Sequence, residues 1–352
     1  MAVRELPKLK ARVRFPSPAP NVWLTPHIRA VFEKPAAATS HLESHMKGMD
    51  VFMNLLTRSD FDGLACAAIL KEAGVIESWK FVHPKDLQDG IVPVTANDVL
   101  ANVPYVEGCG MWFDHHASES ERLGQLVFEG SVRYLDSAAH VIYDYYKDKC
   151  DLSKFDELLE AVDKVDAGKL TSEEILNPED WVLLGYVMDP RTGLGRFRDF
   201  RISNYQLMEI LIECCRTQSI AEIMSSPDIQ ERVSLYKEQS ALFVDMVNAH
   251  TYVKGNVIIT DLRNVETIYA GNRFMIYSLF PEQNISMWIV DGRGKQNCPI
   301  AVGYSILNRT ATVNVGSVLL SYGGGGHKQV GTCQVPYDDC DRVVGELIDK
   351  LQ

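Results

Sequence analysis

An alternation of short apolar runs with helical segments begins near residue 51, and it constrains the fold more than any other feature of the chain. The segment 64–74 has helical spacing and ends at Gly74, after a polar, turn-like segment at 58–63. Ser137 is expected to cap a second helix. Four segments are predicted to be strands: 51–57, 79–84, 110–116 and 132–137. This βαβ pattern predicts a parallel sheet covered by helices, with ligands at the carboxyl ends of its strands.

The rest of the chain predicts a second, smaller α/β domain. Its strands begin after Lys254, include a hairpin around the polar loop 293–298, and are followed by a terminal amphipathic helix. The segment before it has helical composition and no β-rich run, so we interpret it as a helical linker. The expected organisation is a basic, Pro-containing and disordered tail, the first α/β domain, the linker and the second domain, at 1–48, 49–203, 204–250 and 251–352.

Composition excludes several classes of protein. The 352 residues carry a net charge of −12 and 46% of them are hydrophobic, which is typical of a globular protein. The acidic balance argues against a general duplex-DNA binder, and no apolar run is long enough to span a membrane. Eight cysteines without a C-x-x-C pair favour a reducing, cytoplasmic environment. The apolar linker helices are compatible with a homodimer.

Two acidic clusters follow predicted strands. Asp60 and Asp62 are one residue apart, so in a turn both carboxylates can point at one cation, with Gly63 allowing a tight bend behind them. A D-x-D-G sequence is also a common turn without any ligand. Asp114, His115 and His116 follow an apolar strand and could provide oxygen and nitrogen ligands to Mn²⁺, Mg²⁺ or Zn²⁺, or could form a solvated loop.

Three further aspartates are candidate metal ligands. None of them indicates a metal site by itself, but together with the two clusters they do. Asp163 and Asp166 lie near the end of a helical run, and Asp98 precedes VLANVPY. Carboxylates and imidazoles at the ends of successive units should converge on one edge of the sheet. Such a cluster would repel itself without cations, and two divalent ions explain it better than one.

The run Gly323 to Gly326, followed by His327, is the most specific short motif of the second domain. Ordering four glycines is entropically costly, so an ordered run implies that something approaches the backbone closely. Bare N–H groups beside His327 and Lys328 suit a phosphate, and Arg309 could bind the same anion. The alternative is a flexible linker, which fits poorly because VGTCQV follows at once.

The motifs TRSDFDG, WFDHHAS and YGGGGHKQVGT, in this order, resemble those of the DHH phosphoesterases with a DHH-associated C-terminal domain. The resemblance covers the chain from about Met49 onward and is strongest to exopolyphosphatase-related members. One departure is Arg58, where several branches have a histidine, although Arg58 could contact a phosphate.

The resemblance implies two Mn²⁺ ions, which Mg²⁺ or Co²⁺ could replace. It assigns the metal ligands to Asp60, Asp62, Asp98, Asp114, His115 and Asp166, with Asp163 as the alternative to Asp166. It makes Asp114, His115 and His116 catalytic, with Asp114 bridging the ions and His116 nearer the substrate. It also implies that the glycine run, with Gly324, Gly325 and Gly326, and His327 bind the substrate's phosphates. Arg58 and Arg309 join them as candidates because each could place a guanidinium against the same phosphates.

These features lead to a main hypothesis and to alternatives. The main hypothesis is an exopolyphosphatase-related, Mn²⁺-dependent hydrolase that directs a metal-activated hydroxide at a small substrate such as polyphosphate, pyrophosphate or a short nucleotide. The alternatives are an oligoribonuclease that also dephosphorylates 3′-phosphoadenosine 5′-phosphate, with binding of short nucleic acid, and a cyclic-dinucleotide phosphodiesterase. A non-catalytic phosphate-binding regulator belongs to another class and would be expected to have a broken metal set.

Overall fold

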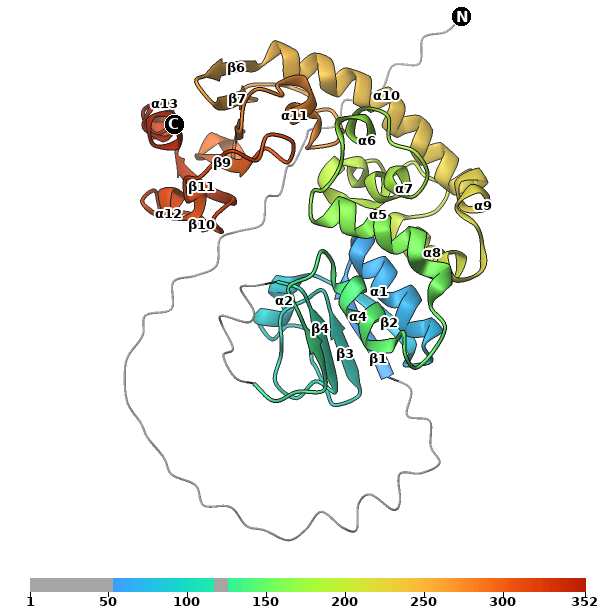
Figure 1. The fold of residues 1–352 in the computed structure, drawn as a ribbon. Coiled ribbons are helices and arrows are strands. Elements are labelled where there is room, and N and C mark those ends of the chain that lie inside the picture. The colour runs from blue at the N-terminus through green and yellow to red at the C-terminus, as the bar shows by residue number, and fades with distance from the viewer. Residues whose placement is uncertain (1–52, 117–125) are drawn as a thin grey trace, which may run out of the picture.

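The computed structural model describes residues 53–116 and 126–352, and the predicted basic tail lies outside them. The first sheet has five strands, all parallel (Figure 1). Their spatial order is β2 (Ile76–Val82), β1 (Met53–Arg58), β3 (Asp98–Ala101), β4 (Met111–Asp114) and β5 (Gly130–Val132). The predicted parallel α/β architecture is therefore confirmed, with β1 near the centre of the sheet.

The two faces of this sheet are covered by helices to different extents, and the core on one face is larger than that on the other. On the face with the larger core, helix α1 (Phe61–Glu72) packs against α4 (Ala138–Tyr146) and α5 (Asp156–Asp166). Helix α5 also packs against α7 (Asp180–Met188). Alternate strand residues such as Leu55 and Phe113 face this large core. Their neighbours Leu56 and Trp112 face a smaller cluster on the opposite side, beneath the short helix α2 (Pro84–Gln88).

Two local predictions about this domain are wrong, and one strand was not predicted. The segment 58–63 is not a turn, because α1 already begins at Phe61 with Asp60 as its N-cap. The strand predicted at 132–137 ends at Val132, and the residues after it form a loop that leads to the Ser137 cap of α4. The strand β3 was not predicted, and Asp98 is its first residue.

The helical segment after residue 203 is part of the first core as well as a linker. Helix α8 (Asn204–Thr217) packs along α1, and α9 (Ile220–Ser225) leads into α10 (Pro227–Ala249). Helix α10 extends across the molecule to the second sheet (Figure 1). No helix in 53–116 or 126–352 combines the length and the apolar character needed to cross a membrane.

The second sheet has six strands of mixed direction. Their order is β10 (Gly325–Gly326), β11 (Val330–Pro336), β9 (Asn297–Tyr304), β8 (Ile285–Ile289), β7 (Val257–Asp261) and β6 (Thr251–Lys254). The antiparallel pair β8–β9 is the predicted hairpin. Three helices accompany the sheet, with the terminal amphipathic one as predicted: α11 (Met275–Leu279), α12 (Val315–Leu320) and α13 (Cys340–Leu351).

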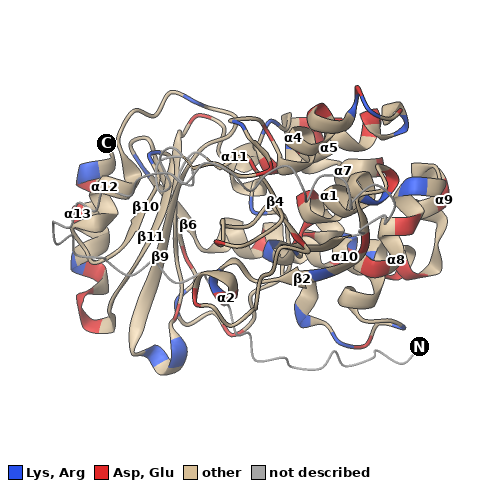
Figure 2. Ribbon diagram, turned by 90° about the horizontal axis from the view of Figure 1, so that it is seen from below, with Lys and Arg blue, Asp and Glu red and all other residues tan. Residues whose placement is uncertain are grey.

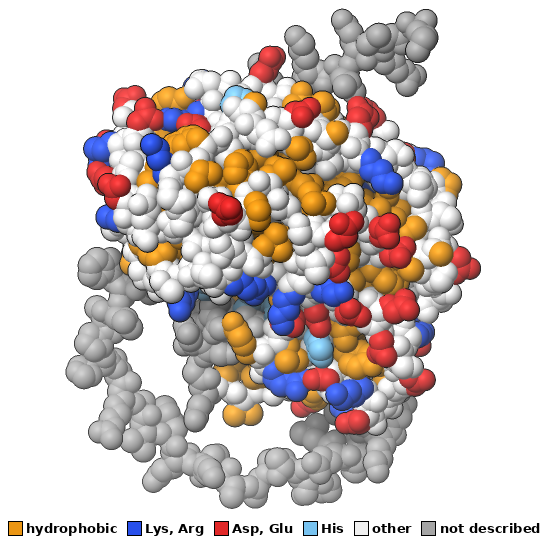
Figure 3. Space-filling view, turned by 45° about the horizontal axis from the view of Figure 1, so that its top comes forward, with side chains coloured by type: hydrophobic (Ala, Val, Ile, Leu, Met, Phe, Trp, Pro, Cys, Tyr) orange, Lys and Arg blue, Asp and Glu red, His pale blue; other side chains and the backbone are white. Residues whose placement is uncertain are grey.

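The outer surface is mixed in charge, and one face is rich in hydrophobic side chains. The peripheral helix α13 carries residues of both signs (Figure 2). Hydrophobic side chains spread over the face formed by α10 and its neighbours (Figure 3). A groove of about 910 Å³ lies between α10, α11 and the segment that joins α6 (Ser172–Leu176) to α7, with Val233, Val244 and Met275 in its lining.

The glycine run is ordered and forms a tight hairpin. Gly325 and Gly326 pair with Thr332 and Gly331 of β11, so what approaches this backbone closely is the protein's own chain. A Cβ at Gly324 would overlap the Thr332 carbonyl oxygen and Cys333, whereas one at Gly325 would meet no atom within 4 Å. The flexible-linker alternative is therefore wrong, and only some of these glycines are required by packing.

These two neighbouring glycines give a matched test of the hairpin. We expect Gly324→Ala to lower the free energy of unfolding by about 1–3 kcal/mol, since the added methyl group must displace β11. Gly325→Ala should change it by less than about 0.5 kcal/mol. Chemical denaturation of both variants measures the difference in the free energy of unfolding. Equal stability of the two variants would contradict the close contact between Gly324 and β11.

Candidate metal centre

The carboxylates after β1 are fixed by the ends of two helices. Asp60 caps α1 and accepts a hydrogen bond from the Gly63 N–H at 2.9 Å. Asp62, in the first turn of α1, is 1% exposed and accepts the N–H groups of Ala138 (3.0 Å) and Ala139 (2.8 Å) at the start of α4. The first N–H groups of a helix have no partner within it, so they stabilise a buried negative charge.

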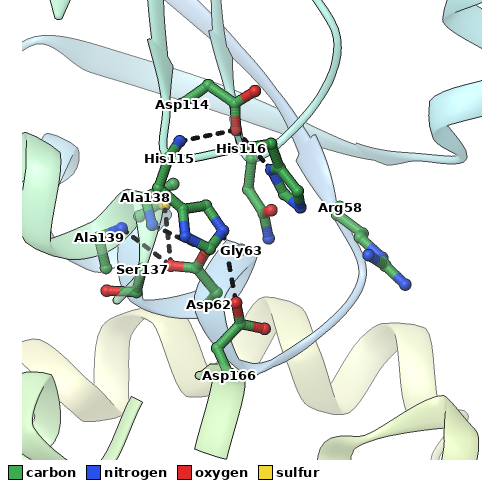
Figure 4. Close-up of polar contacts among 12 residues, drawn as sticks. Arg58, Asp62, Gly63, Asp114, His115, His116, Ser137, Ala138, Ala139 and Asp166 are labelled. Carbon is green, nitrogen blue, oxygen red and sulfur yellow. Dashed lines mark hydrogen bonds and ion pairs between the residues drawn. The ribbon is translucent and has the colours of Figure 1, made fainter. Parts of the chain in front are cut away.

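Asp114 is the last residue of β4 and is also 1% exposed. One of its oxygens accepts hydrogen bonds from the backbone N–H of His115 at 2.9 Å and from Nδ1 of His116 at 2.8 Å (Figure 4). The parallel register brings this strand end to the same edge as the end of β1. The predicted convergence of these two clusters is therefore what the structure shows.

His115 has the geometry of a metal ligand. Its Nδ1 lies 3.2 Å from the Leu135 carbonyl, which can only accept, so Nδ1 carries the proton and Nε2 keeps a lone pair. This Nε2 is buried and has no hydrogen-bond partner among the described residues. It lies 3.4 Å from Asp166 Oδ2 and 3.9 Å from Asp62 Oδ2 (Figure 4). A lone pair facing two carboxylates is unfavourable unless a cation lies between them.

Two groups of side chains could hold a metal ion, and they share His115. One consists of Asp62, His115 and Asp166, and the other of Asp114, His115 and His116. Within each group the potential ligand atoms lie within 4.8 Å of one another. Carboxylate oxygens and an imidazole nitrogen suit Mn²⁺, Mg²⁺ and Zn²⁺. The residues therefore fit the metal ions that the sequence motifs imply.

The structure distinguishes Asp166 from Asp163. Asp166 ends α5 and faces His115, whereas both oxygens of Asp163 are engaged elsewhere. One accepts from the Ser137 hydroxyl at 2.6 Å, and the other contacts Nδ1 of His140 at 2.6 Å. Asp166 is thus brought into the cluster, and Asp163 supports the start of α4.

Asp98 is not brought to the cluster. It begins β3, at the amino edge of the sheet, where it accepts hydrogen bonds from Asn54 and from the backbone and hydroxyl groups of Thr95. The carboxyl end of the same strand is followed by Asn102, whose amide donates to Asp60 at 3.0 Å. The sequence D-V-L-A-N contained this signal, because a strand that starts at Asp98 must present Asn102, not Asp98, at the ligand-binding edge.

The residues predicted to bind phosphate lie in two places. Arg58 ends β1 and forms a 3.0 Å ion pair with Asp60. Arg309 belongs to the second domain and donates to the carbonyl of Gly168 at 2.8 Å, directly after the Asp166 helix. Gly324, Gly325, Gly326 and the exposed His327 lie on or beside the hairpin of the second sheet. Arg309 therefore links the loop after α5 to the domain that carries the glycine run.

Burial changes the ionisation of the cluster. Burial, followed by the charge of Asp166, raises the pKa of Asp62 to about 7, and burial likewise raises the pKa of Asp60 despite the neighbouring Arg58. For His116, burial lowers the pKa, but the hydrogen bond to Asp114 outweighs it and raises the pKa to about 9. Without cations, the cluster therefore retains protons that a bound metal ion would have to displace.

The comparisons with known proteins agree with this geometry. No protein-family model matches the chain, and no curated protein sequence matches it. Among solved structures, the pGpG-specific phosphodiesterase PggH from Vibrio cholerae is 44% identical with a TM-score of 0.75. That alignment covers 85% of this chain and 98% of PggH.

Two more distant structures were also found. The DHH domain of a member of a family of ribosomal proteins is 14% identical, with a TM-score of 0.49 and coverage of 86% of both chains. CDC45 from Entamoeba histolytica is 8% identical, with a TM-score of 0.39, and the alignment covers 86% of this chain and 96% of CDC45. Both similarities are too low to indicate a function. On the strength of the PggH match, the chain belongs to the DHH superfamily, and it is a metal-dependent phosphoesterase.

The raised pKa values predict that metal binding depends on pH. A carboxyl group whose pKa is higher in the folded than in the unfolded chain destabilises the fold as the pH rises above the unfolded value of about 3.9. For Asp62 this loss is complete above its folded value of about 7. We expect saturating Mn²⁺ to raise the melting temperature more at neutral pH than at about pH 5, since protons compete with the ion.

Thermal unfolding of chelator-treated protein, with and without Mn²⁺, measures this dependence. The variant Asp62→Asn should show a smaller Mn²⁺ effect at both pH values. A Mn²⁺-induced shift in the wild type that is as large at about pH 5 as at neutral pH would contradict the assignment.

Proposed function

We propose that the chain is a Mn²⁺-dependent phosphodiesterase that hydrolyses 5′-phosphorylated dinucleotides such as pGpG. The observation that carries the proposal is the buried Nε2 of His115, which faces Asp62 and Asp166 and has no hydrogen-bond partner in the part of the chain that the structure describes. The substrate class is suggested by the similarity to PggH over 98% of that protein. This similarity favours the short-nucleotide alternative over the exopolyphosphatase-related hypothesis that the motifs first suggested.

One group of residues would bind the metal ions, and a second group positions these ligands. Asp62, Asp114, His115 and Asp166 would hold the ions, with Asp60 beside them. The ions would supply Lewis acidity toward the phosphoryl group and a water of lowered pKa. Leu135 and the start of α4 hold His115 and Asp62 in place, so the ligands need little reorganisation when they bind.

His116 is placed to act on the substrate. Its side chain is 43% exposed, in contrast to the buried Asp114, and its Nδ1 is held by that carboxylate. The other ring nitrogen, Nε2, is then left to donate to a phosphoryl oxygen or to the departing ribose oxygen. His116 would therefore orient the substrate and deliver a proton, with Asp114 fixing the orientation of the ring.

The non-catalytic alternative predicts a broken metal set. The described residues instead contain two groups suited to a metal ion, joined by a histidine in the correct tautomer. A protein that only binds nucleotide would have no need to orient His115 Nε2 toward two carboxylates. We therefore favour turnover over binding alone.

A hydrolysis assay with Mn²⁺ tests the proposal. We expect cleavage of pGpG to two mononucleotides, with much slower release of phosphate from polyphosphate or pyrophosphate. Asp114→Ala should reduce turnover by at least roughly 100-fold, because loss of even the outer partners of metal ligands costs 10- to 100-fold.

Asp98→Asn is the matched control, since it changes an aspartate of the same sheet at the opposite edge. It should retain turnover and Mn²⁺ content. Hydrolysis of polyphosphate in preference to pGpG, or near-normal turnover by Asp114→Ala, would contradict the proposal.

A further inference from the structure

An arginine at the junction of the two domains has no hydrogen-bond partner among the described residues. Arg273 lies just before α11, and its Nε is buried. Its guanidinium lies 4.4 Å from the centre of the Phe274 ring. A buried donor without an acceptor costs free energy in every folded molecule. A side chain kept in this state therefore points to an acceptor that binds from outside the chain.

The segment before Arg273 is hydrogen-bonded to the turn that carries a second arginine. The N–H of Gly271 donates to the Thr192 carbonyl at 2.9 Å, which ties the segment before α11 to the turn η2 (Pro190–Thr192). In that turn, Arg191 is held by Asp189 through contacts of its Nε with both carboxylate oxygens, at 2.8 and 2.9 Å. Asp189 is the hydrogen-bond partner of Arg191 within the described residues.

The charge of Asp189 acts on both arginines, and both arginines interact electrostatically with Asp166 of the metal cluster. Burial, followed by the charge of Arg191, lowers the pKa of Arg273 to about 10, and Asp166 partly opposes this. The charge of Arg191 also acts on Asp60. Two guanidinium groups against Asp189 leave an excess positive charge next to the carboxylates. Such a pair is suited to a doubly charged anion that presents several acceptor oxygens.

We infer that Arg273, together with Arg191, binds the terminal 5′-phosphate of the dinucleotide while the metal cluster takes the phosphodiester. This inference rests on the proposed function and specifies which part of the substrate is recognised. A terminal phosphate carries roughly −1.5 to −2 charge and three acceptor oxygens, whereas the phosphodiester carries a single charge. The excess charge and the free donors of the pair match the terminal group. Arg273 is a specificity-determining residue that raises kcat/KM for substrates with a 5′-phosphate.

The test compares pGpG with GpG, which lacks the terminal phosphate, in the Mn²⁺-loaded full chain. For Arg273→Met we expect kcat/KM on pGpG to fall roughly 10- to 100-fold, the cost of a lost charge-assisted contact. Hydrolysis of GpG, measured with the same protein preparation, should stay unchanged, and this also shows that the variant is folded. Arg273→Lys should recover part of the loss on pGpG, because the charge is kept.

Arg342→Met on α13 is the charge-matched control, since Arg342 is exposed and pairs with Asp339 and Glu346. It should leave both substrates unaffected. An equal loss on pGpG and GpG in Arg273→Met would overturn the inference, because Arg273 would then serve the phosphodiester or the fold. An unchanged preference for pGpG would overturn it as well and would leave the proposed function standing. If the wild type cleaves neither substrate, the proposed function itself fails.

Discussion

The burial of Asp62 is the constraint on which the rest of the site depends. A carboxylate that is 1% exposed needs compensation, and the N–H groups of Ala138 and Ala139 provide it. Those groups are available because Ser137 caps α4, and α4 is in contact with α1, the helix that carries Asp62. The sheet, the two helices and the charge are therefore mutually dependent. A bound cation would complete this arrangement, because the helix ends alone leave Asp62 with a raised pKa.

The second domain reaches the same cluster through backbone contacts. Arg309 donates to the carbonyl of Gly168, two residues after Asp166, and the N–H of Gly271 donates to Thr192. Both contacts join residues of the second half of the chain to segments that border the carboxylates. The residues of the second domain that are predicted to bind phosphate and the candidate metal ligands of the first are thus fixed on one scaffold. This arrangement suits a substrate whose reacting and non-reacting phosphates must be held at the same time.

The sequence was sufficient for the architecture and for most of the cluster, and the errors have physical causes. Buried parallel strands are apolar runs, and their carboxyl ends predict where Asp60, Asp62, Asp114 and His115 meet. Asp98 was misplaced because it was assigned from the family motif, although a residue that precedes an apolar run begins the strand. Asn102 was missed because the short strand β3 between them was not predicted. The roles of Leu135 and Arg273 depend on a backbone carbonyl and on a distant loop, which no local pattern encodes.

The most direct test of the account is whether His115 coordinates the metal through nitrogen. Electron spin-echo spectroscopy of Mn²⁺ bound to the protein detects a directly coordinated imidazole nitrogen. The buried lone pair of His115 Nε2 predicts such a coupling, which should persist in His116→Gln and disappear in His115→Gln. Bound Mn²⁺ without nitrogen coupling, or coupling that survives the loss of His115, would contradict the metal centre described above.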